Sequence, residues 1–221
     1  MKKHSLSRTF SIVAVLGLGL TVCLCNLGMA ADWPQWGGTD CRNMVSDETG
    51  LPDFFEPGHK TSNSEGIDPT TTKNVCWAAV LGTYAYGNPT IADGRVFVGT
   101  DDLNVSDDPR FRRTKGGLVK CLDEKTGELL WQLACPKRTR IPKDAHYGFQ
   151  HLGVCSSPAV EGNKAYVITS GGDVLCLDVE GQANGNDGPF TDEGQFMAGE
   201  GETPIELKPC DADIIWRYNL I

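Results

Sequence analysis

One stretch of the sequence gathers the oxygen-bearing side chains that a hard cation prefers. Residues 183–194 read ANGNDGPFTDEG, and carboxylate and amide oxygens are the usual protein ligands of Ca²⁺. Their spacing is not that of an EF-hand, and a solvated loop of Gly, Asn and Asp is the simpler interpretation. The pattern therefore predicts a surface loop first, and only second a calcium site with Asp187 and Asp192 as its first ligands.

A second group of reactive side chains lies in KDAHYGFQHLGVCSSP, residues 143–158. His146 and His151 are five apart, so on a strand they would point to opposite sides, and one metal would reach both only in a loop. Ser156 and Ser157 lack the G-x-S-x-G pattern of a nucleophile elbow. We expect these side chains to pack or to face solvent, and we assign no catalytic residue.

The cysteines indicate neither a zinc ribbon nor a covalently attached haem. Two of the nine fall in residues 1–30, and the other seven contain no C-x-x-C. Cys121 and Cys176 stand among apolar neighbours, which predicts small buried side chains. Cys135 with Cys155 is the disulfide pair that we would test first.

An internal repeat in the sequence predicts the strands that hold these side chains. PTIADGRVFVGT, residues 89–100, aligns without a gap on PAVEGNKAYVIT, residues 158–169, and both predict strand, tight turn, strand. Asp93-Gly94 and Gly162-Asn163 are pairs that tolerate the positive φ of hairpin turns. Short apolar runs bounded by turn residues, with no long helical period, predict an all-β fold.

A second block repeats as well. GLVKCLDEKTGELLW, residues 117–131, matches GDVLCLDVEG, residues 172–181. The match then breaks off over an insert near residues 181–212 and resumes with DIIWRY, residues 213–218. Each unit is thus predicted to be a four-stranded antiparallel sheet whose fourth strand carries a Trp.

NVCWAAVL, residues 74–81, supplies a third copy of the fourth strand, so Trp77, Trp131 and Trp216 occupy equivalent positions. Such a sheet cannot bury both faces alone, whereas sheets stacked radially can, which is the arrangement of a propeller. We expect each indole to fill the space between two blades, where its N–H needs a partner.

The block LDEKTGELLW, which contains Asp123, Gly127 and Trp131, resembles the tryptophan-docking motif of the pyrroloquinoline-quinone (PQQ)-like β-propeller family. The resemblance implies a partial β-propeller over residues 74–221, with about two and a half blades, of the exported bacterial type. Family members with closed rings use about eight blades, so we expect an incomplete chain, with self-assembly of several copies into a ring as the alternative. Asp123 and Asp178 recur at the same turn and are expected to cap it.

The N-terminus predicts export. Lys2, Lys3 and Arg8 precede an apolar run that ends in Gly28-Met29-Ala30, which is typical of a secretory signal peptide over residues 1–30. Residues 31–73 are rich in turn residues and predict a loop-rich segment. The expected location is periplasmic or extracellular, with no membrane attachment after cleavage.

Charge excludes two classes of partner. Removing residues 1–30 takes three of the 20 basic residues and none of the 29 acidic ones, which leaves a distinctly acidic chain. It has no cluster of Lys and Arg interleaved with aromatic residues, so we expect neither nucleic acid nor an anionic membrane as a partner.

Two functions follow from the resemblance. The first is a non-catalytic binding or scaffolding module, comparable to the PQQ-like repeat proteins that assist outer-membrane protein assembly, with proteins or further blades as partners. The alternative is a fragment of a PQQ-dependent alcohol or sugar dehydrogenase. Such enzymes hold PQQ and calcium with an adjacent Cys-Cys pair, a stacking Trp and acidic side chains, and residues 31–221 contain no adjacent cysteines. We assign no cofactor-binding residue.

Overall fold

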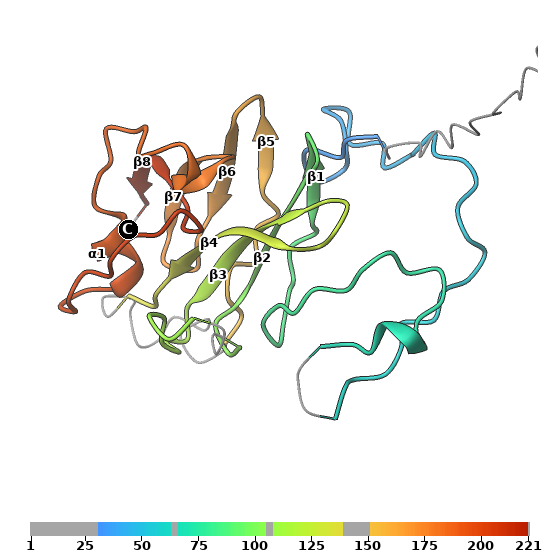
Figure 1. Cartoon of the computed structure of the whole chain (residues 1–221). Helices are drawn as coiled ribbons and strands as arrows, with labels where there is room; N and C mark the ends of the chain where they lie inside the picture. The colour runs from blue at the N-terminus through green and yellow to red at the C-terminus, as the bar shows by residue number, and fades with distance from the viewer. Residues whose placement is uncertain (1–30, 63–65, 105–107, 139–150, 221) are drawn as a thin grey trace, which may run out of the picture. The chain divides into compact units, whose positions relative to one another are not determined.

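The computed structural model describes residues 31–62, 66–104, 108–138 and 151–220 (Figure 1). Within these ranges the chain forms two four-stranded antiparallel sheets, in strand orders β1-β2-β3-β4 and β5-β6-β7-β8. The all-β prediction of four-stranded antiparallel blades is therefore confirmed. The predicted signal peptide and His146 lie outside the described residues.

We call the two sheets blade 1 and blade 2. Blade 1 consists of β1 (Thr90–Ala92), β2 (Arg95–Asp101), β3 (Gly117–Asp123) and β4 (Leu129–Cys135). Blade 2 consists of β5 (Ala159–Glu161), β6 (Lys164–Ile168), β7 (Asp173–Asp178) and β8 (Ile214–Asn219). Each strand pairs with the next along the chain, so each blade is a simple meander.

Turn chemistry sets the register of both inner hairpins. Asp93 and Gly94 have φ of 48° and 74° and join Ala92 to its partner Arg95. Gly162, with φ of 57°, opens the equivalent turn in blade 2. Positive φ at these positions matches the twist of the flanking strands, as two-residue hairpins require.

Both outer hairpins contain the same irregularity. Cys121 pairs with Trp131 and Leu122 with Leu129, so Leu130 is the extra residue of a β-bulge. In blade 2 the register shifts in the same way between Cys176 and Leu177. A bulge re-aims the side chain beside it, and here that side chain is the Trp in both blades.

The first part of the described chain holds few regular elements. A 3-10 helix, η1 (Pro69–Thr71), stands among isolated bridges. Trp33 pairs with Ile91 of β1 through N···O distances of 2.8 and 3.0 Å, and the Pro34 carbonyl accepts from Val160 of β5 at 2.7 Å. Residues 33–34 therefore connect the inner strands of the two blades.

The expectation of a fourth strand at residues 74–81 is wrong, because no regular strand forms there. The side chains of blade 1 bond this part of the backbone instead. The Lys120 ammonium donates to the Val80 carbonyl at 3.2 Å, and the Thr100 hydroxyl accepts from Gly82 N–H at 2.9 Å. These backbone groups at the end of the segment take side-chain partners in place of strand neighbours.

The insert contains two short helices, η3 (Gly181–Ala183) and α1 (Glu193–Ala198). The interpretation of residues 183–194 as a solvated loop holds for exposed residues such as Asn184 and Asp187 but is wrong at its end, where Glu193 is fully buried. Met197 of α1 is 3% exposed and belongs to the core. Apolar residues beyond the predicted loop draw its end against β4.

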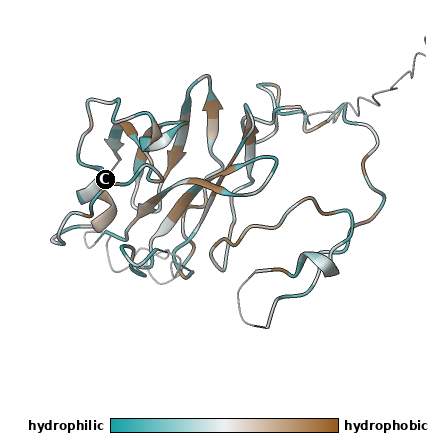
Figure 2. Cartoon of the chain, in the orientation of Figure 1, coloured by the Kyte–Doolittle hydropathy of each residue, from teal (hydrophilic) through white to brown (hydrophobic). Residues whose placement is uncertain are grey.

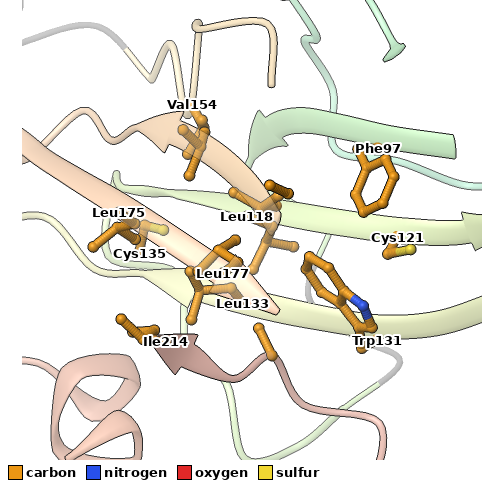
Figure 3. Close-up of a cluster of buried hydrophobic side chains, with 14 of the residues drawn as sticks. Phe97, Leu118, Cys121, Trp131, Leu133, Cys135, Val154, Leu175, Leu177 and Ile214 are labelled. Atoms are coloured by element: carbon orange, nitrogen blue, oxygen red, sulfur yellow. The ribbon is translucent and has the colours of Figure 1, made fainter. Parts of the chain in front are cut away.

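One buried cluster extends through both blades. Figure 2 shows the hydrophobic stretches lying along the strands, and Figure 3 shows how side chains of the two blades meet. Phe97, Val119 and Leu133 come from one face of blade 1, and Leu175 and Leu177 from the facing side of blade 2. The interior between the blades, which we call the seam, is therefore the core of the described structure.

Leu133 and Tyr218 occupy the same place in their blades but differ in burial, at 0% and 64% exposed. We expect Leu133→Ala to lower the free energy of unfolding by about 2–5 kcal/mol, because it leaves a cavity in the seam. Tyr218→Ala should cost less than about 1 kcal/mol. Urea unfolding of the two variants measures this difference, and equal losses would contradict a core confined to one side of blade 2.

Candidate functional site at the blade seams

Trp131 fastens blade 1 to blade 2. Its side chain is 1% exposed, and its indole N–H donates to the Val179 carbonyl in the turn after β7, at 2.8 Å. The ring lies against Gly181, which has φ of 61° and where an added Cβ would stand 2.8 Å from the indole. Only glycine meets both demands, positive φ and close approach.

Trp77 repeats this arrangement on blade 1. Its indole N–H donates to the Glu124 carbonyl at 2.7 Å, and its ring lies against Gly127, which has φ of 73°. Glu124 directly follows Asp123, and Val179 directly follows the equivalent Asp178, so the two accepting carbonyls occupy equivalent positions in their turns. The contact of one indole with a carbonyl and a glycine of the next turn, which we call the indole latch, is thus a repeating element of the fold.

Trp216, the third equivalent residue, has no further turn to meet among the described residues and is 39% exposed. Its ring packs on Tyr166 of the same sheet, with centroids 6.1 Å apart. By strand register, Tyr166, Ile168, Val174, Cys176, Trp216 and Tyr218 share one face of blade 2 with Lys164 and Asp178, and we call these first six side chains the open face. Its counterpart on blade 1 is covered by blade 2.

The two recurring aspartates cap the turns that receive the indoles. Asp123 Oδ1 accepts from the backbone N–H of Lys125 and Thr126 at 2.9 and 2.8 Å. Hydrogen bonds from Thr126 hold the pKa of Asp123 below its usual value. Asp178 Oδ1 accepts from Glu180 N–H at 2.7 Å. Each aspartate therefore fixes the turn whose carbonyl and glycine form the latch.

Charged pairs cross the seam beside the latch. Arg110, in the connection after β2, binds Asp211 of the insert with N···O distances of 2.7 and 2.8 Å. Arg138, which follows β4, binds Asp173 of β7 at 2.7 Å. Both aspartates are at most 1% exposed, and burial raises the pKa of Asp173. Bidentate geometry such as that of Arg110 fixes orientation as well as charge.

The insert buries a second acidic pair that sequence reasoning missed. Glu193 and Asp213 are both 0% exposed. Glu193 accepts from the Asn186 amide at 2.9 Å, and Asp213 Oδ2 accepts from Asp187 N–H at 2.9 Å. Burial raises the pKa of Asp213 to about 6, and the charges of Glu193 and Asp178 act in the same direction. No pattern in the sequence distinguishes these acids from exposed ones.

Asp187 and Asp192, the predicted calcium ligands, are both exposed. Asp187 accepts from the Asn184 amide at 3.0 Å, and Asp192 is the N-cap residue of α1. In the described ranges no three Asp, Glu, His or Cys side chains are arranged to hold a metal ion. The calcium site stays a prediction.

The serines and His151 take no catalytic arrangement. Ser156 Oγ donates to the Ile168 carbonyl at 2.9 Å and accepts from Ile168 N–H at 3.0 Å. Ser157 Oγ accepts from Asn88 N–H at 2.8 Å. His151 is half-buried, and its Nδ1 has no hydrogen-bond partner in the described structure. The Ser156 hydroxyl therefore bonds the backbone of blade 2, and the Ser157 hydroxyl bonds the backbone just before β1 of blade 1.

All seven cysteines of the described chain are free. The pairing of Cys135 with Cys155 is not formed, since Cys135 is buried at the end of β4 whereas Cys155 is exposed. Cys121 and Cys176 are fully buried, in agreement with their apolar neighbours. Burial raises the pKa of Cys121 to about 12, so this thiol is inert at neutral pH.

Consecutive four-stranded blades joined by indole latches define a β-propeller repeat protein. A model of the PQQ-like repeat family described as outer membrane protein assembly factor BamB matches residues 67–186 and again residues 104–219, and the chain belongs to this family. The resemblance seen in the sequence is thereby confirmed.

Among solved structures, the chain is similar to BamB from Moraxella catarrhalis, with 16% identity and a TM-score of 0.29. That match covers 61% of this chain and 24% of the other, so the chain spans about a quarter of the relative's length. A search of curated proteins finds no match. Within the described ranges no helix has the length and hydropathy needed to cross a membrane.

Two glycines of similar φ test the latch. Gly181 (φ 61°) lies against the Trp131 indole, whereas Gly162 (φ 57°) has open space around it. We expect Gly162→Ala to cost about 1–2 kcal/mol of unfolding free energy for positive φ alone. Gly181→Ala should cost about 1–3 kcal/mol more, because the indole must move. Urea unfolding followed by Trp fluorescence measures both, and equal costs would argue against the latch.

The raised pKa of Asp213 predicts a pH dependence of stability. Between about pH 4 and about pH 6 the folded chain holds a proton on Asp213 that the unfolded chain has released. The free energy of unfolding should therefore fall as pH rises through this window. Asp213→Asn should flatten that fall in urea unfolding series, whereas Asp192→Asn, at an exposed position, should retain it. An unchanged slope in Asp213→Asn would refute the assignment.

Proposed function

We propose that this chain is an exported, non-catalytic binding or scaffolding module whose partners, either other proteins or further blades, pack on the open face of blade 2. The observation that carries the proposal is the indole latch, which is filled at Trp77 and Trp131 and unfilled at Trp216 among the described residues. A further blade or a protein partner that supplies a backbone carbonyl and a glycine of positive φ would complete the third latch.

The chemistry of the open face supports a protein partner. Ile168, Trp216 and Tyr218 are 49%, 39% and 64% exposed on one side of one sheet. Trp and Tyr are enriched among the residues that dominate binding energy at protein interfaces, and clustered exposed apolar groups mark such sites. The family description, an assembly factor for outer membrane proteins, points to the same class of function.

Export rests on the sequence of residues 1–30, with its basic start, apolar run and small-residue end. A protein that binds others outside the cytoplasm fits that leader and the acidic, soluble character of the rest of the chain. We propose a periplasmic or extracellular location.

The alternative, a fragment of a PQQ-dependent dehydrogenase, has less support. No two cysteines of residues 31–221 are adjacent, and in the described part no three carboxylates, imidazoles or thiols are arranged to hold a metal ion. The indoles of Trp77 and Trp131 are already engaged between turns. These residues therefore give the dehydrogenase alternative less support than the scaffold.

Site-specific photo-crosslinking in bacteria tests the scaffold. The full chain, with residues 1–30, would carry a photoreactive residue at Tyr218 or, as the matched control, at Leu51, which are 64% and 69% exposed. We expect protein adducts from position 218 that are absent from position 51. Adding Trp216→Ser should reduce the adducts about tenfold or more, as loss of an interface hot spot does. Equal yields at both positions would refute the proposal.

A further inference from the structure

The described chain carries the two kinds of surface that form a blade seam. The open face of blade 2 corresponds to the face of blade 1 that packs in the seam, and Trp216 stands there at the place of Trp131. The opposite face of blade 1, which we call the back face, corresponds to the side of blade 2 that receives blade 1. On β2 and β3 the back face carries six side chains: Val96, Val98, Thr100, Leu118, Lys120 and Leu122.

The back face has much of the apolar chemistry of its counterpart on blade 2. Val98 and Leu122 align in the repeat with Val167 and Leu177, which are 3% and 0% exposed beneath blade 1. Lys120 departs from this match, because blade 2 has a leucine at the aligned position. The back face therefore offers an open face much of the surface that blade 2 offers to blade 1.

An irregular segment, residues 74–84, lies on the back face where a blade would otherwise pack, and we call it the plug. The Lys120 ammonium donates to the Val80 carbonyl at 3.2 Å, and the Thr100 hydroxyl donates to the Tyr84 carbonyl at 2.9 Å. The plug forms no regular strand, and each of its residues is partly or fully exposed. It therefore shields the back face as a single layer, without a sheet of its own.

Trp77 anchors the plug in a socket that a second tryptophan can also fit. The socket consists of the Glu124 carbonyl, 2.7 Å from the Trp77 indole nitrogen, and of Gly127 beneath the ring. Trp131 makes the same contacts from a regular strand and is 1% exposed, whereas Trp77 is only half-buried. Trp216 also stands on a regular strand and meets no such turn in the described ranges. The socket on blade 1 thus suits Trp216 of a second copy as well as Trp77.

We infer that copies of this chain join by tryptophan exchange: Trp216 of one copy displaces Trp77 from the socket of the next, and the open face packs on that copy's back face. This pairing rests on the proposed function, in which a partner packs on the open face, and makes that partner a second copy. Because the contact joins unlike faces, it can continue from copy to copy. Propellers close with about 4–8 blades, so copies of two blades each would form rings of about two to four copies.

Emptying the socket should promote this assembly. Trp77 competes from the same chain, at an effective concentration of about the millimolar range, so the natural chain should associate weakly. In the full chain, exported with residues 1–30 and then purified, Trp77→Ser should strengthen self-association about tenfold or more. Sedimentation velocity should show rings of about two to four copies. Trp36→Ser, at a position 49% exposed, is the matched control and should sediment as the natural chain does.

Mixing two forms tests the exchange directly. The double variant Trp77→Ser/Trp216→Ser has an empty socket but no indole at position 216, and alone it should stay monomeric. Mixed with the natural chain, which offers Trp216, it should form a one-to-one pair and nothing larger. Adding Gly127→Ala to the double variant should abolish the pair, because the new Cβ would occupy the place of the ring. Gly94→Ala, with φ of 74° against 73° but open space around it, should retain the pair.

Crosslinking of the natural chain decides the question if Trp77→Ser fails to fold. A photoreactive residue at Tyr218 should give adducts of twice the chain's mass, joined to the plug or the back face of a second copy. The pairing is refuted if those adducts contain only other proteins, a result that leaves the proposed function standing. Absence of any adduct contradicts both. The pairing is also refuted if folded Trp77→Ser sediments like the natural chain, or if the mixture forms no pair.

Discussion

The hydrogen bond from a tryptophan indole to a main-chain carbonyl of the next turn is the interaction on which the described structure depends. An indole N–H taken out of water without a partner costs several kcal/mol, and at Trp131 the Val179 carbonyl supplies that partner at 2.8 Å. The ring can reach the carbonyl only because Gly181 has no Cβ. The β-bulge before each Trp of the two blades aims the ring, and a capping aspartate fixes the turn that receives it.

Because the latch repeats, the same sheet face has two different physical roles. On blade 1 it is the core: Phe97, Cys121 and Trp131 are at most 1% exposed under blade 2. On blade 2 the corresponding residues form the open face, where Trp216 lies partly in solvent. The kinds of apolar side chain that fill the seam on blade 1 are therefore available on blade 2 for a further blade or a protein partner. This availability links the fold of this BamB-family chain to its proposed scaffold role.

The insert departs from the repeat and adds polar structure to the seam. It brings Asp211 to Arg110 and places Glu193 and Asp213 beneath β8. Its residues Met197 and Ile205 also line a cavity at the end of blade 1. These buried carboxylates are stable only with arginines, backbone N–H groups or protons as partners, so this part of the chain is more sensitive to charge and pH than the apolar seam.

The sequence alone determined the repeat, because turn residues and alternating apolar residues are local signals: the hairpins at Asp93-Gly94 and Gly162-Asn163, and the equivalence of Trp131 with Trp216. It misplaced a strand at residues 74–81, since a strand needs a neighbour that only the folded chain reveals. Tertiary structure alone decided which groups are buried and paired. Asp102, Glu193 and Asp213 look like any acidic residue in the sequence, and their desolvation arises from elements distant in the chain.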